Sequence, residues 1–172
     1  MLCSTVMIPT AEANAPQSAT DVPAHHAYLE AIGKVFFHVY ASSAVQLFLP
    51  AELRALLETS RRNNVARGVS GMLLYKDGNF LQVLEGREAA VIAIAAKIQR
   101  DPRHRGLITL MEGFESEYQF PEWSMGFCDL RSDEAKSMPG YSAFLESTFD
   151  PKALASDPTA AQRLLLSFKR NM

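Results

Sequence analysis

The sequence predicts an α+β fold of order β-α-β-β-α-β-β, with two helices on one face of a five-stranded sheet. Three observations lead to this expectation. Short segments rich in β-branched and aromatic residues alternate with two segments whose apolar residues repeat at helical spacing. An Asp-Gly pair separates two of the strand-like segments. Glycine or proline follows each helix-like segment, where a helix is expected to end.

The first strand and the first helix occupy residues 34–64. Residues 34–42, KVFFHVYAS, are rich in β-branched and aromatic side chains, which favour a strand. Residues 50–64, PAELRALLETSRRNN, predict a helix because a proline suits the first turn and Gly68 follows as a terminator. The residues that repeat at helical spacing on one face are Leu53, Leu56, Leu57, Ser60 and Asn64.

The second half of the pattern runs from a hairpin to a fifth strand. Residues 69–75 and 79–86 predict two antiparallel strands joined by the turn KDGN. Residues 87–100 predict a helix that ends at Asp101-Pro102. Its buried face is expected to hold Val91, Ile94, Ala95 and Ile98. Residues 107–115 and 123–130 are the fourth and fifth expected strands.

This order is the ferredoxin-like split pattern with one added strand, a sandwich of helices on a sheet. Residues 1–33 are expected to form a flexible N-terminal arm with a short helix near HHAYLEAIG. Residues 34–130 form the predicted domain, and residues 131–172 a C-terminal helical extension. Residues 159–170, TAAQRLLLSFKR, are the clearest helix of that extension. The sheet face opposite the two helices, together with the closing helices, is the expected interaction surface.

Length and composition exclude several classes of protein. The 172 residues suit one domain with a tail, and 48% hydrophobic residues suffice for a buried core. A net charge of −2 gives no sign of a nucleic-acid surface. Cys3 and Cys128 fit neither a disulfide nor a metal pattern, and a reducing cytoplasm is expected. No apolar run approaches the roughly 18 residues that span a bilayer, and no Lys or Arg precedes Lys34 as in a signal peptide.

Polar residues interrupt the apolar pattern at three places. Gln82 shares a strand face with apolar neighbours, Asn63 and Asn64 end the helical stripe, and Tyr40 ends the first strand. Asn and Gln carry a donor and an acceptor and do not titrate, so a cluster of them suits a ligand edge that alternates acceptors and donors. The pyrimidine edge of a flavin is such an edge. Taken singly, Gln82 also fits a solvent-facing or satisfied core amide, the asparagines fit caps, and Tyr40 fits a core residue.

Together these segments resemble a known family. VYASS, SRRNNVARGVSGMLLY, NFLQVLEG, IQRDPRHRG and FPEWSMGF, in this order and spacing, are similar to the BLUF domain, the sensor of blue light using FAD. The resemblance runs from about Lys34 to Leu130. It implies the same β-α-β-β-α-β-β fold and a noncovalently bound FAD.

The resemblance also implies roles for individual residues. Tyr40 would donate an electron and Gln82 would bridge it to the flavin, with Trp123 and Met125 completing the photochemical set. The implied contacts to the flavin edge and ring are Asn63, Asn64, Arg103, Leu56 and Ile98.

Three positions add detail to this comparison. Ala41 stands where the family often has serine. Lys97 stands where the family often has Arg or His, and fits either a flavin contact or a solvated helix charge. His104 is a further candidate contact to the flavin side chain or its phosphates.

The function that the resemblance implies is a blue-light photoreceptor rather than an enzyme. Light would rearrange the Tyr40–Gln82–flavin hydrogen bonds, and residues 123–127 would relay the change. The expected output is a separate partner protein, either a cyclic-di-nucleotide enzyme or a transcription regulator, with self-association into a homo-oligomer and no direct contact with nucleic acid or membrane. The alternative is a ferredoxin-like regulatory module that binds a small molecule without photochemistry. An acylphosphatase-like enzyme is disfavoured because residues 40–50 contain no Arg or Gly for an anion-binding loop.

Overall fold

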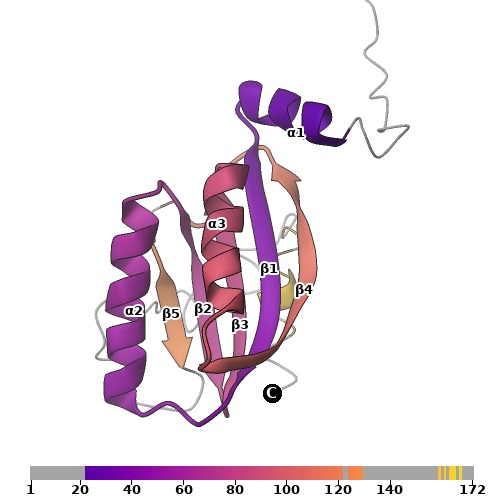
Figure 1. Cartoon of the computed structure of the whole chain (residues 1–172). Helices are drawn as coiled ribbons and strands as arrows, with labels where there is room; N and C mark the ends of the chain where they lie inside the picture. The colour runs from indigo at the N-terminus through magenta and orange to yellow at the C-terminus, as the bar shows by residue number, and fades with distance from the viewer. Residues whose placement is uncertain are drawn as a thin grey trace, which may run out of the picture.

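One mixed sheet forms the centre of the molecule (Figure 1). The computed structural model describes residues 22–121 and 124–129, together with residues 159, 161, 163–165 and 167. In this part of the chain five strands pair in the order β4-β1-β3-β2-β5. The strands are β1 (Val35–Ala44), β2 (Ser70–Lys76), β3 (Asn79–Gly86), β4 (His104–Glu115) and β5 (Gly126–Asp129). The helices are α1 (Val22–Ala31), α2 (Pro50–Val65) and α3 (Glu88–Gln99).

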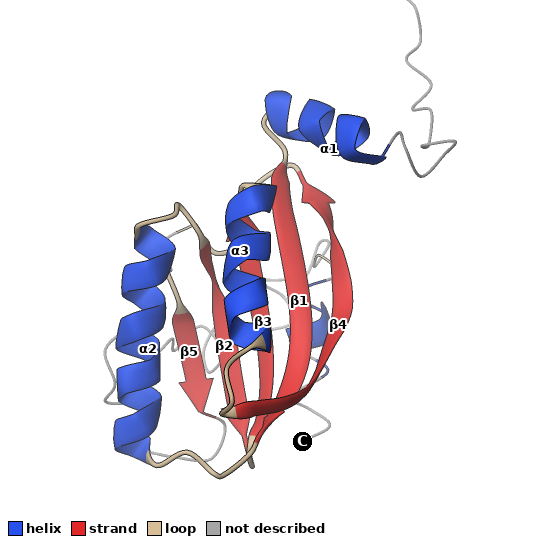
Figure 2. Ribbon diagram, viewed as in Figure 1, coloured by secondary structure: helices blue, strands red, loops and turns tan. Residues whose placement is uncertain are grey.

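The strand pairing follows from the order of elements along the chain. β1 pairs antiparallel with β3 and with β4, β2 pairs antiparallel with β3, and β5 is parallel to β2. Both helical crossovers place their helices on the same side, so α2 and α3 lie next to each other on one face of the sheet (Figure 2). The α+β architecture of ferredoxin-like type that the sequence predicts is confirmed.

The hairpin between β2 and β3 fixes the position of Gln82. Asp77 and Gly78 both have positive φ, 53° and 80°, which is the backbone of the tight turn that an Asp-Gly pair predicts. This turn sets the register in which Leu73 lies opposite Gln82. On the other side of β3, Tyr40 of β1 lies opposite Gln82. The register therefore makes Tyr40 and Gln82 direct neighbours on the same sheet face.

The face under the helices holds a large apolar cluster. Leu53 and Leu57 of α2, and Val91 and Ile94 of α3, are buried against it. The strand residues of this cluster include Phe36, Tyr40, Phe80 and Leu84. These four residues were predicted correctly from the helical spacing. Leu56 and Ile98 are partly buried against the same cluster, and Ser60 and Ala95 are half-buried.

The opposite face of the sheet is also buried, which corrects the expectation of an exposed interaction face. Val39, Met72, Leu74 and Val83 are inaccessible to solvent there. They pack in a second cluster with Phe120 and with Ala161 and Leu165 from near the end of the chain. The physical reason is visible in residues 72–75, MLLY, a continuous apolar run, because strands covered on both sides lack hydrophobic-polar alternation.

Several element boundaries differ from the sequence-based expectation. β4 begins at His104 rather than at residue 107, because its pairing with β1 continues to the end of that strand at Ala44. β5 begins at Gly126 rather than at residue 123. The short helix expected near HHAYLEAIG is present as α1, which begins earlier, at Val22, and ends at Ala31. Near the chain end, residues 161, 163–165 and 167 have helical backbone. Three parts of the expectation lie outside the described residues: residues 1–21 of the arm, Trp123, and residues 131–158, 160, 162, 166 and 168–172 of the extension.

Candidate functional site

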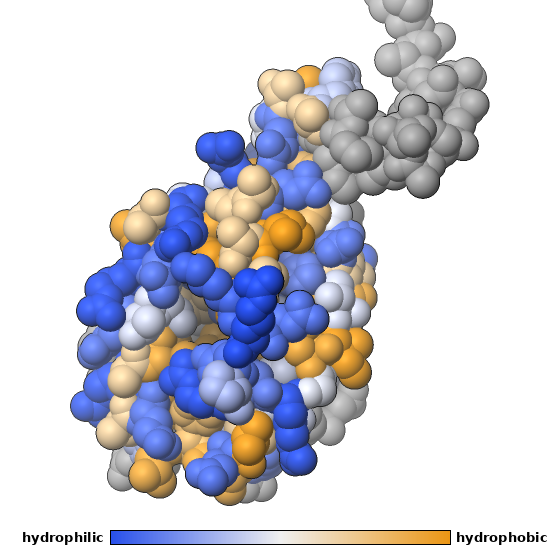
Figure 3. All heavy atoms as spheres, viewed as in Figure 1, coloured by the Kyte–Doolittle hydropathy of each residue, from blue (hydrophilic) through white to orange (hydrophobic). Residues whose placement is uncertain are grey.

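A cavity of about 140 Å³ lies between α2 and α3 over β3. The space-filling view shows the hollow between the two helices (Figure 3). Its apolar walls include Leu56 of α2 and Ile94 and Ile98 of α3. Its polar lining comes from Thr59, Ser60, Asn63, Asn64, Arg67, Gln82, Lys97, Asp101 and Arg103. Apolar walls with a few converging polar groups are typical of small-ligand sites.

The phenol of Tyr40 and the amide of Gln82 are joined at the inner end of this cavity. The Tyr40 O–H donates a hydrogen bond to Gln82 Oε1, and both side chains are buried, at 1% and 4% exposure. Burial raises the pKa of Tyr40 well above its ordinary value of 10.0, with a smaller contribution from Asp101 in the same direction. The phenol is therefore neutral and keeps its proton available to Gln82.

The other end of the Gln82 amide contacts Met125. Gln82 Nε2 lies 3.2 Å from the Met125 sulfur, to which it donates. Met125 immediately precedes β5 and is 2% exposed. A thioether is a weak acceptor, so this contact holds the amide loosely compared with a carbonyl. Gln82 consequently has one firm partner and one weak partner, and it also faces the cavity.

Two side chains of α2 hold the backbone just before β5. Asn64 Nδ2 donates to the Ser124 carbonyl at 2.6 Å, and Arg61 Nε donates to the Met125 carbonyl at 3.0 Å. Asn64 is thus not a side-chain cap of α2. Its own carbonyl instead accepts the backbone N–H groups of Arg67 and Val69 at the helix end. Within the described residues, the Asn64 side-chain carbonyl accepts no hydrogen bond and is available to a ligand in the cavity.

A buried carboxylate holds the other end of the connection between β4 and β5. Glu85 is 1% exposed and accepts hydrogen bonds from the Ser70 hydroxyl and from the backbone N–H groups of Gln119 and Phe120. Burial raises the pKa of Glu85, and these three hydrogen bonds oppose that rise. This role of Glu85 is not predicted from the sequence, where its signal is a glutamate inside the apolar strand FLQVLEG.

Arg103 forms a fork with Asp101 at the mouth of the cavity. Its Nη2 lies 2.6 Å from Asp101 Oδ2 and its Nε lies 2.9 Å from Asp101 Oδ1. The hydrogen bond from Arg103 is the main reason that the pKa of Asp101 falls to about 2. His104 lies apart from the cavity lining. Its imidazole Nδ1 is 2.9 Å from the Ser42 hydroxyl, and its ring is 4.8 Å from that of Phe80.

The structure brings together most of the residues singled out from the sequence. Seven of the nine expected cofactor contacts line the cavity, the exceptions being Tyr40, which lies behind Gln82, and His104. Met125 contacts Gln82, and Trp123 lies outside the described residues. Three further lining residues, Thr59, Arg67 and Asp101, had no role in the expectation. Asp101 was interpreted only as the end of the second helix, although its spacing of two residues from Arg103 permits their ion pair.

The donor set of the cavity fits a flavin. Gln82 and Asn64 present nonionisable amides, which match the alternating acceptors and donor of the isoalloxazine edge. Leu56 and Ile98 supply apolar surface from opposite helices for a flat ring. Within the described residues no group of three or more His, Cys, Asp or Glu side chains could hold a metal ion. None of the described helices is long and apolar enough to cross a membrane.

A family model agrees with this assignment. The model for BLUF, described as sensors of blue light using FAD, matches residues 35–126 of the chain. The match covers β1 to β4, the first residue of β5 and both helices that form the cavity.

A longer protein resembles the chain over an overlapping region. The photoactivated adenylate cyclase subunit beta of Euglena longa is 30% identical over 122 residues, which is 63% of this chain and 14% of that protein. The chain therefore spans about one seventh of the length of this curated relative.

Two solved structures resemble the fold. Klebsiella pneumoniae BlrP1 with FMN and cyclic diGMP matches with a TM-score of 0.64 and 29% identity, over 80% of this chain and 35% of that one. The photo-activated state of BlsA matches with a TM-score of 0.55 and 30% identity, over 80% of this chain and 92% of that one.

Proposed function

We infer the function from one premise, which is that this chain belongs to the BLUF family, the sensors of blue light using FAD. We propose that it is a photoreceptor, not an enzyme, that binds FAD noncovalently between α2 and α3. The observation that carries this proposal is the hydrogen bond from the buried Tyr40 phenol to Gln82, whose amide also faces the cavity. A redox-active phenol and a reorientable amide beside one ligand site are what a light-driven hydrogen-bond switch requires.

Different side chains of the cavity would contact different parts of the flavin. Asn64, with Asn63 beside it, would hold the polar edge of the ring, and Leu56 and Ile98 would contact its faces. Arg103 would approach the O2 carbonyl of the flavin from the cavity mouth, where Lys97 adds a second positive charge. His104 would act only indirectly, because its imidazole is bound to Ser42.

The switch follows from the bonds of Tyr40 and Gln82. When bound, a flavin supplies an acceptor that blue light converts into a strong oxidant. Tyr40 would supply the electron that this acceptor takes up, and its phenolic proton would pass along the existing bond to Gln82 Oε1. The electron and the proton would both return to Tyr40 in the reverse transfer, and the Gln82 amide would be left rotated or tautomerised. The rearranged hydrogen bonds would differ in free energy from the dark-state ones by on the order of 1–2 kcal/mol, which is the contribution of one hydrogen bond.

The signal would leave through the segment before β5. Gln82 Nε2 bonds to Met125, so a rearranged amide changes what holds that residue. A change of this size biases only an element that is nearly balanced between two positions. Trp123, two residues before Met125, belongs to the same proposed relay.

The output is proposed to be a separate protein. The named relatives include an adenylate cyclase subunit, an Escherichia coli antirepressor regulated by blue light and temperature, and a protein solved with cyclic diGMP. We therefore propose a cyclic-di-nucleotide enzyme or a transcription regulator as the partner, in the cytoplasm, with a homo-oligomeric sensor. Residues 1–33 and 131–172 would flank the sensing domain, the latter as a helical extension that packs on the sheet through Ala161 and Leu165.

The test uses colour and its response to light. Protein purified from flavin-replete cells is expected to be yellow, and blue light is expected to shift its absorption to the red, with recovery in the dark. Tyr40→Phe is expected to stay yellow and lose the shift, because the electron donor is gone. A full shift in Tyr40→Phe would refute the donor role. A colourless protein that takes up no flavin would favour the alternative, a binding module without photochemistry.

A further inference from the structure

Arg61 of α2 reaches the backbone that precedes β5. Its Nε donates to the Met125 carbonyl at 3.0 Å, next to the Ser124 carbonyl that Asn64 of the same helix binds. Met125 is also held from the sheet, because Gln82 Nε2 lies 3.2 Å from its sulfur. This one residue is therefore bound from two directions, through its carbonyl by α2 and through its side chain by β3.

The guanidinium of Arg61 is only partly used by this contact. Its Nη2 is buried and, among the residues that the structure describes, is the one buried side-chain nitrogen or oxygen without a hydrogen-bond partner. A buried donor without an acceptor carries a free-energy cost, which is larger when the donor is charged. A guanidinium remains protonated in proteins, so the charge cannot be lost to avoid that cost. The unpartnered nitrogen therefore needs a physical explanation.

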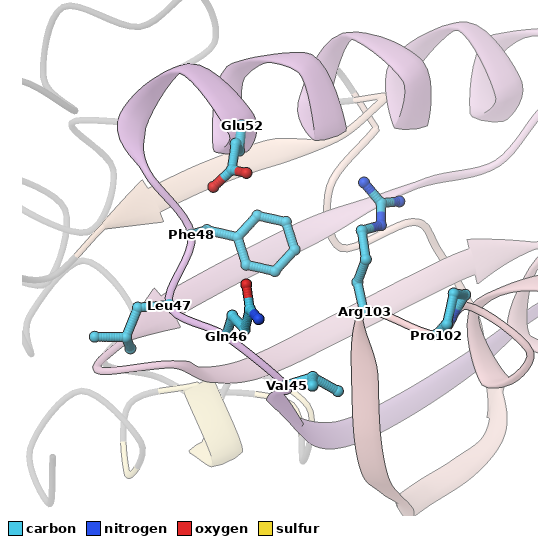
Figure 4. A pocket seen from close by; sticks show the side chains of 7 residues that line it. All are labelled: Val45, Gln46, Leu47, Phe48, Glu52, Pro102 and Arg103. Atoms are coloured by element: carbon cyan, nitrogen blue, oxygen red, sulfur yellow. The ribbon is translucent and has the colours of Figure 1, made fainter.

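The position of Nη2 within the guanidinium supplies one. Nε and Nη2 lie on the same edge of the planar group, and this edge can bind two acceptor atoms side by side. Arg103 shows such an edge fully used, since its Nε and Nη2 bind Asp101 at 2.9 and 2.6 Å. Arg103 lines a cavity beside the first turn of α2 (Figure 4), at the opposite end of that helix from Arg61. At Arg61, one half of the same edge binds Met125 and the other half is unused.

The Met125 carbonyl is the acceptor best placed to fill the unused half. A carbonyl oxygen has two lone pairs and can accept two donors, and this carbonyl already binds Nε of the same edge. A small displacement along the edge would let it accept Nη2 as well. Glu58, whose charge acts on Arg61, is exposed and makes no hydrogen bond to Nη2.

The contact between Gln82 and the Met125 sulfur opposes this displacement. While Gln82 Nε2 donates to the sulfur, Met125 is held toward β3. The rearrangement of the Gln82 amide under light would remove that donor and leave Arg61 as the contact that positions Met125. Its carbonyl can then move until both N–H groups of the edge are bound.

We propose that Arg61 is a positioning residue that holds Met125 in two alternative places, with one hydrogen bond in the dark and with two after illumination. The second bond gives Nη2 its acceptor, and it stabilises the lit arrangement against return. This inference depends on the proposed function, because it begins with the rearranged amide of Gln82. It adds the residue that carries the change from the sheet to α2 and prolongs the signal.

Infrared spectroscopy tests the change at the carbonyl itself. The flavin-bound protein is prepared with ¹³C at the carbonyl carbon of its methionines, of which the chain has seven. Because a second hydrogen bond lowers the stretching frequency of a carbonyl, light-minus-dark spectra are expected to show a label-sensitive band that moves to lower frequency. Met125→Leu carries no label at that position, so the band is expected to disappear. A band that persists in Met125→Leu, or no such band in the wild-type protein, would overturn the inference.

Arg61→Lys removes the second nitrogen of the edge and keeps one charged donor. It is expected to bind flavin and to show the red shift, because Tyr40 and Gln82 are intact. It is expected to lose the label-sensitive band and to recover in the dark about tenfold faster. Tenfold corresponds to about 1.4 kcal/mol of activation free energy, which the lit arrangement loses with its second hydrogen bond.

Arg62→Lys is the matched control. Arg62 is the next residue on α2, is exposed, and contacts only Thr59 of the same helix among the described side chains. Its variant is expected to match wild type in dark recovery and in the carbonyl band.

The outcomes separate this inference from the function on which it depends. Wild-type recovery and an unchanged carbonyl band in Arg61→Lys, with or without a lower melting temperature, would mean that Arg61 only stabilises the fold. That result would overturn the inference and leave the proposed function standing. If Arg61→Lys does not fold, the labelled wild-type protein and Met125→Leu still decide the question. A wild-type protein without a light-induced red shift would overturn both proposals.

Discussion

Gln82 combines a strong and a weak hydrogen bond in a place where water is excluded. Its Oε1 accepts from the Tyr40 phenol, and its Nε2 donates to the sulfur of Met125. Breaking the bond from Gln82 Nε2 to the Met125 sulfur costs little free energy, because a thioether accepts an N–H weakly. Breaking the bond from Tyr40 to Gln82 Oε1 costs more, because a buried phenol without an acceptor costs about 1–3 kcal/mol. The pair is therefore built so that the amide, rather than the phenol, moves.

Replacing Gln82 with leucine tests this view. Gln82→Leu is expected to bind flavin, because the cavity walls and Asn64 remain, but to show no red shift under blue light. The free energy of unfolding is expected to fall by about 1–3 kcal/mol, because the Tyr40 hydroxyl loses its acceptor inside the protein. Light-minus-dark absorption spectra and thermal unfolding of the same samples give both values. Normal photocycling of Gln82→Leu would remove this amide from the mechanism.

At the scale of elements, the connection between β4 and β5 is fixed at both ends by long-range contacts. Glu85 of β3 holds the backbone N–H groups of Gln119 and Phe120. Asn64 and Arg61 of α2 hold the carbonyls of Ser124 and Met125. Between these two anchors lies the approach to β5, a short strand at the sheet edge. An element held at a few points can change position when one of them changes.

Glu85→Gln tests the first anchor. Its amide keeps one acceptor oxygen, but its NH₂ group faces a backbone N–H, so one buried donor loses its partner at a cost of about 1–3 kcal/mol. We expect flavin binding to persist, the melting temperature to fall, and dark recovery to become about tenfold faster, because a loosened connection lowers by about 1.4 kcal/mol the barrier for returning Met125 and Gln82 to their dark contact. Recovery is followed by absorption after a blue pulse.

The control for Glu85→Gln is Glu117→Gln, an exposed carboxylate in the same connection between β4 and β5. It is expected to leave both the melting temperature and dark recovery close to wild type. Unchanged recovery in Glu85→Gln despite a lower melting temperature would show that Glu85 stabilises the fold and does not position the switch.

At the scale of the whole molecule, sequence predicts best what repeats locally. The spacing of apolar residues in α2, in α3 and in the hairpin strands was sufficient to place Leu57, Ile94 and Gln82 between the helices and the sheet. The role of Glu85 could not be predicted, because its backbone partners are 34 and 35 residues away. The coverage of the second sheet face depends on Leu165, which is still more remote in sequence from the strands it covers. Such contacts are decided by topology, which no local pattern encodes.

The pH dependence of stability involves a buried carboxyl group, Glu85 of β3, and a half-buried imidazole, His104 of β4. For Glu85, burial raises the pKa above the ordinary 4.5, so its contribution to stability is complete below pH 4.5 and is lost as the pH rises through its folded value. For His104, burial lowers the pKa below the ordinary 6.5, with Asp101 opposing and Arg103 reinforcing that change. Its contribution is complete above pH 6.5 and is lost as the pH falls through its folded value.

Between about pH 4.5 and 6.5 these two contributions therefore run in opposite directions and partly offset each other. Removing one should expose the other. In Glu85→Gln the melting temperature is expected to fall as the pH is lowered from 7 to 4.5, because only the imidazole still titrates. In His104→Gln it is expected to rise over the same range, because only the carboxylate does. Differential scanning calorimetry in steps of half a pH unit measures both slopes relative to wild type. Parallel curves for all three proteins would mean that neither group is responsible for the pH dependence of this fold.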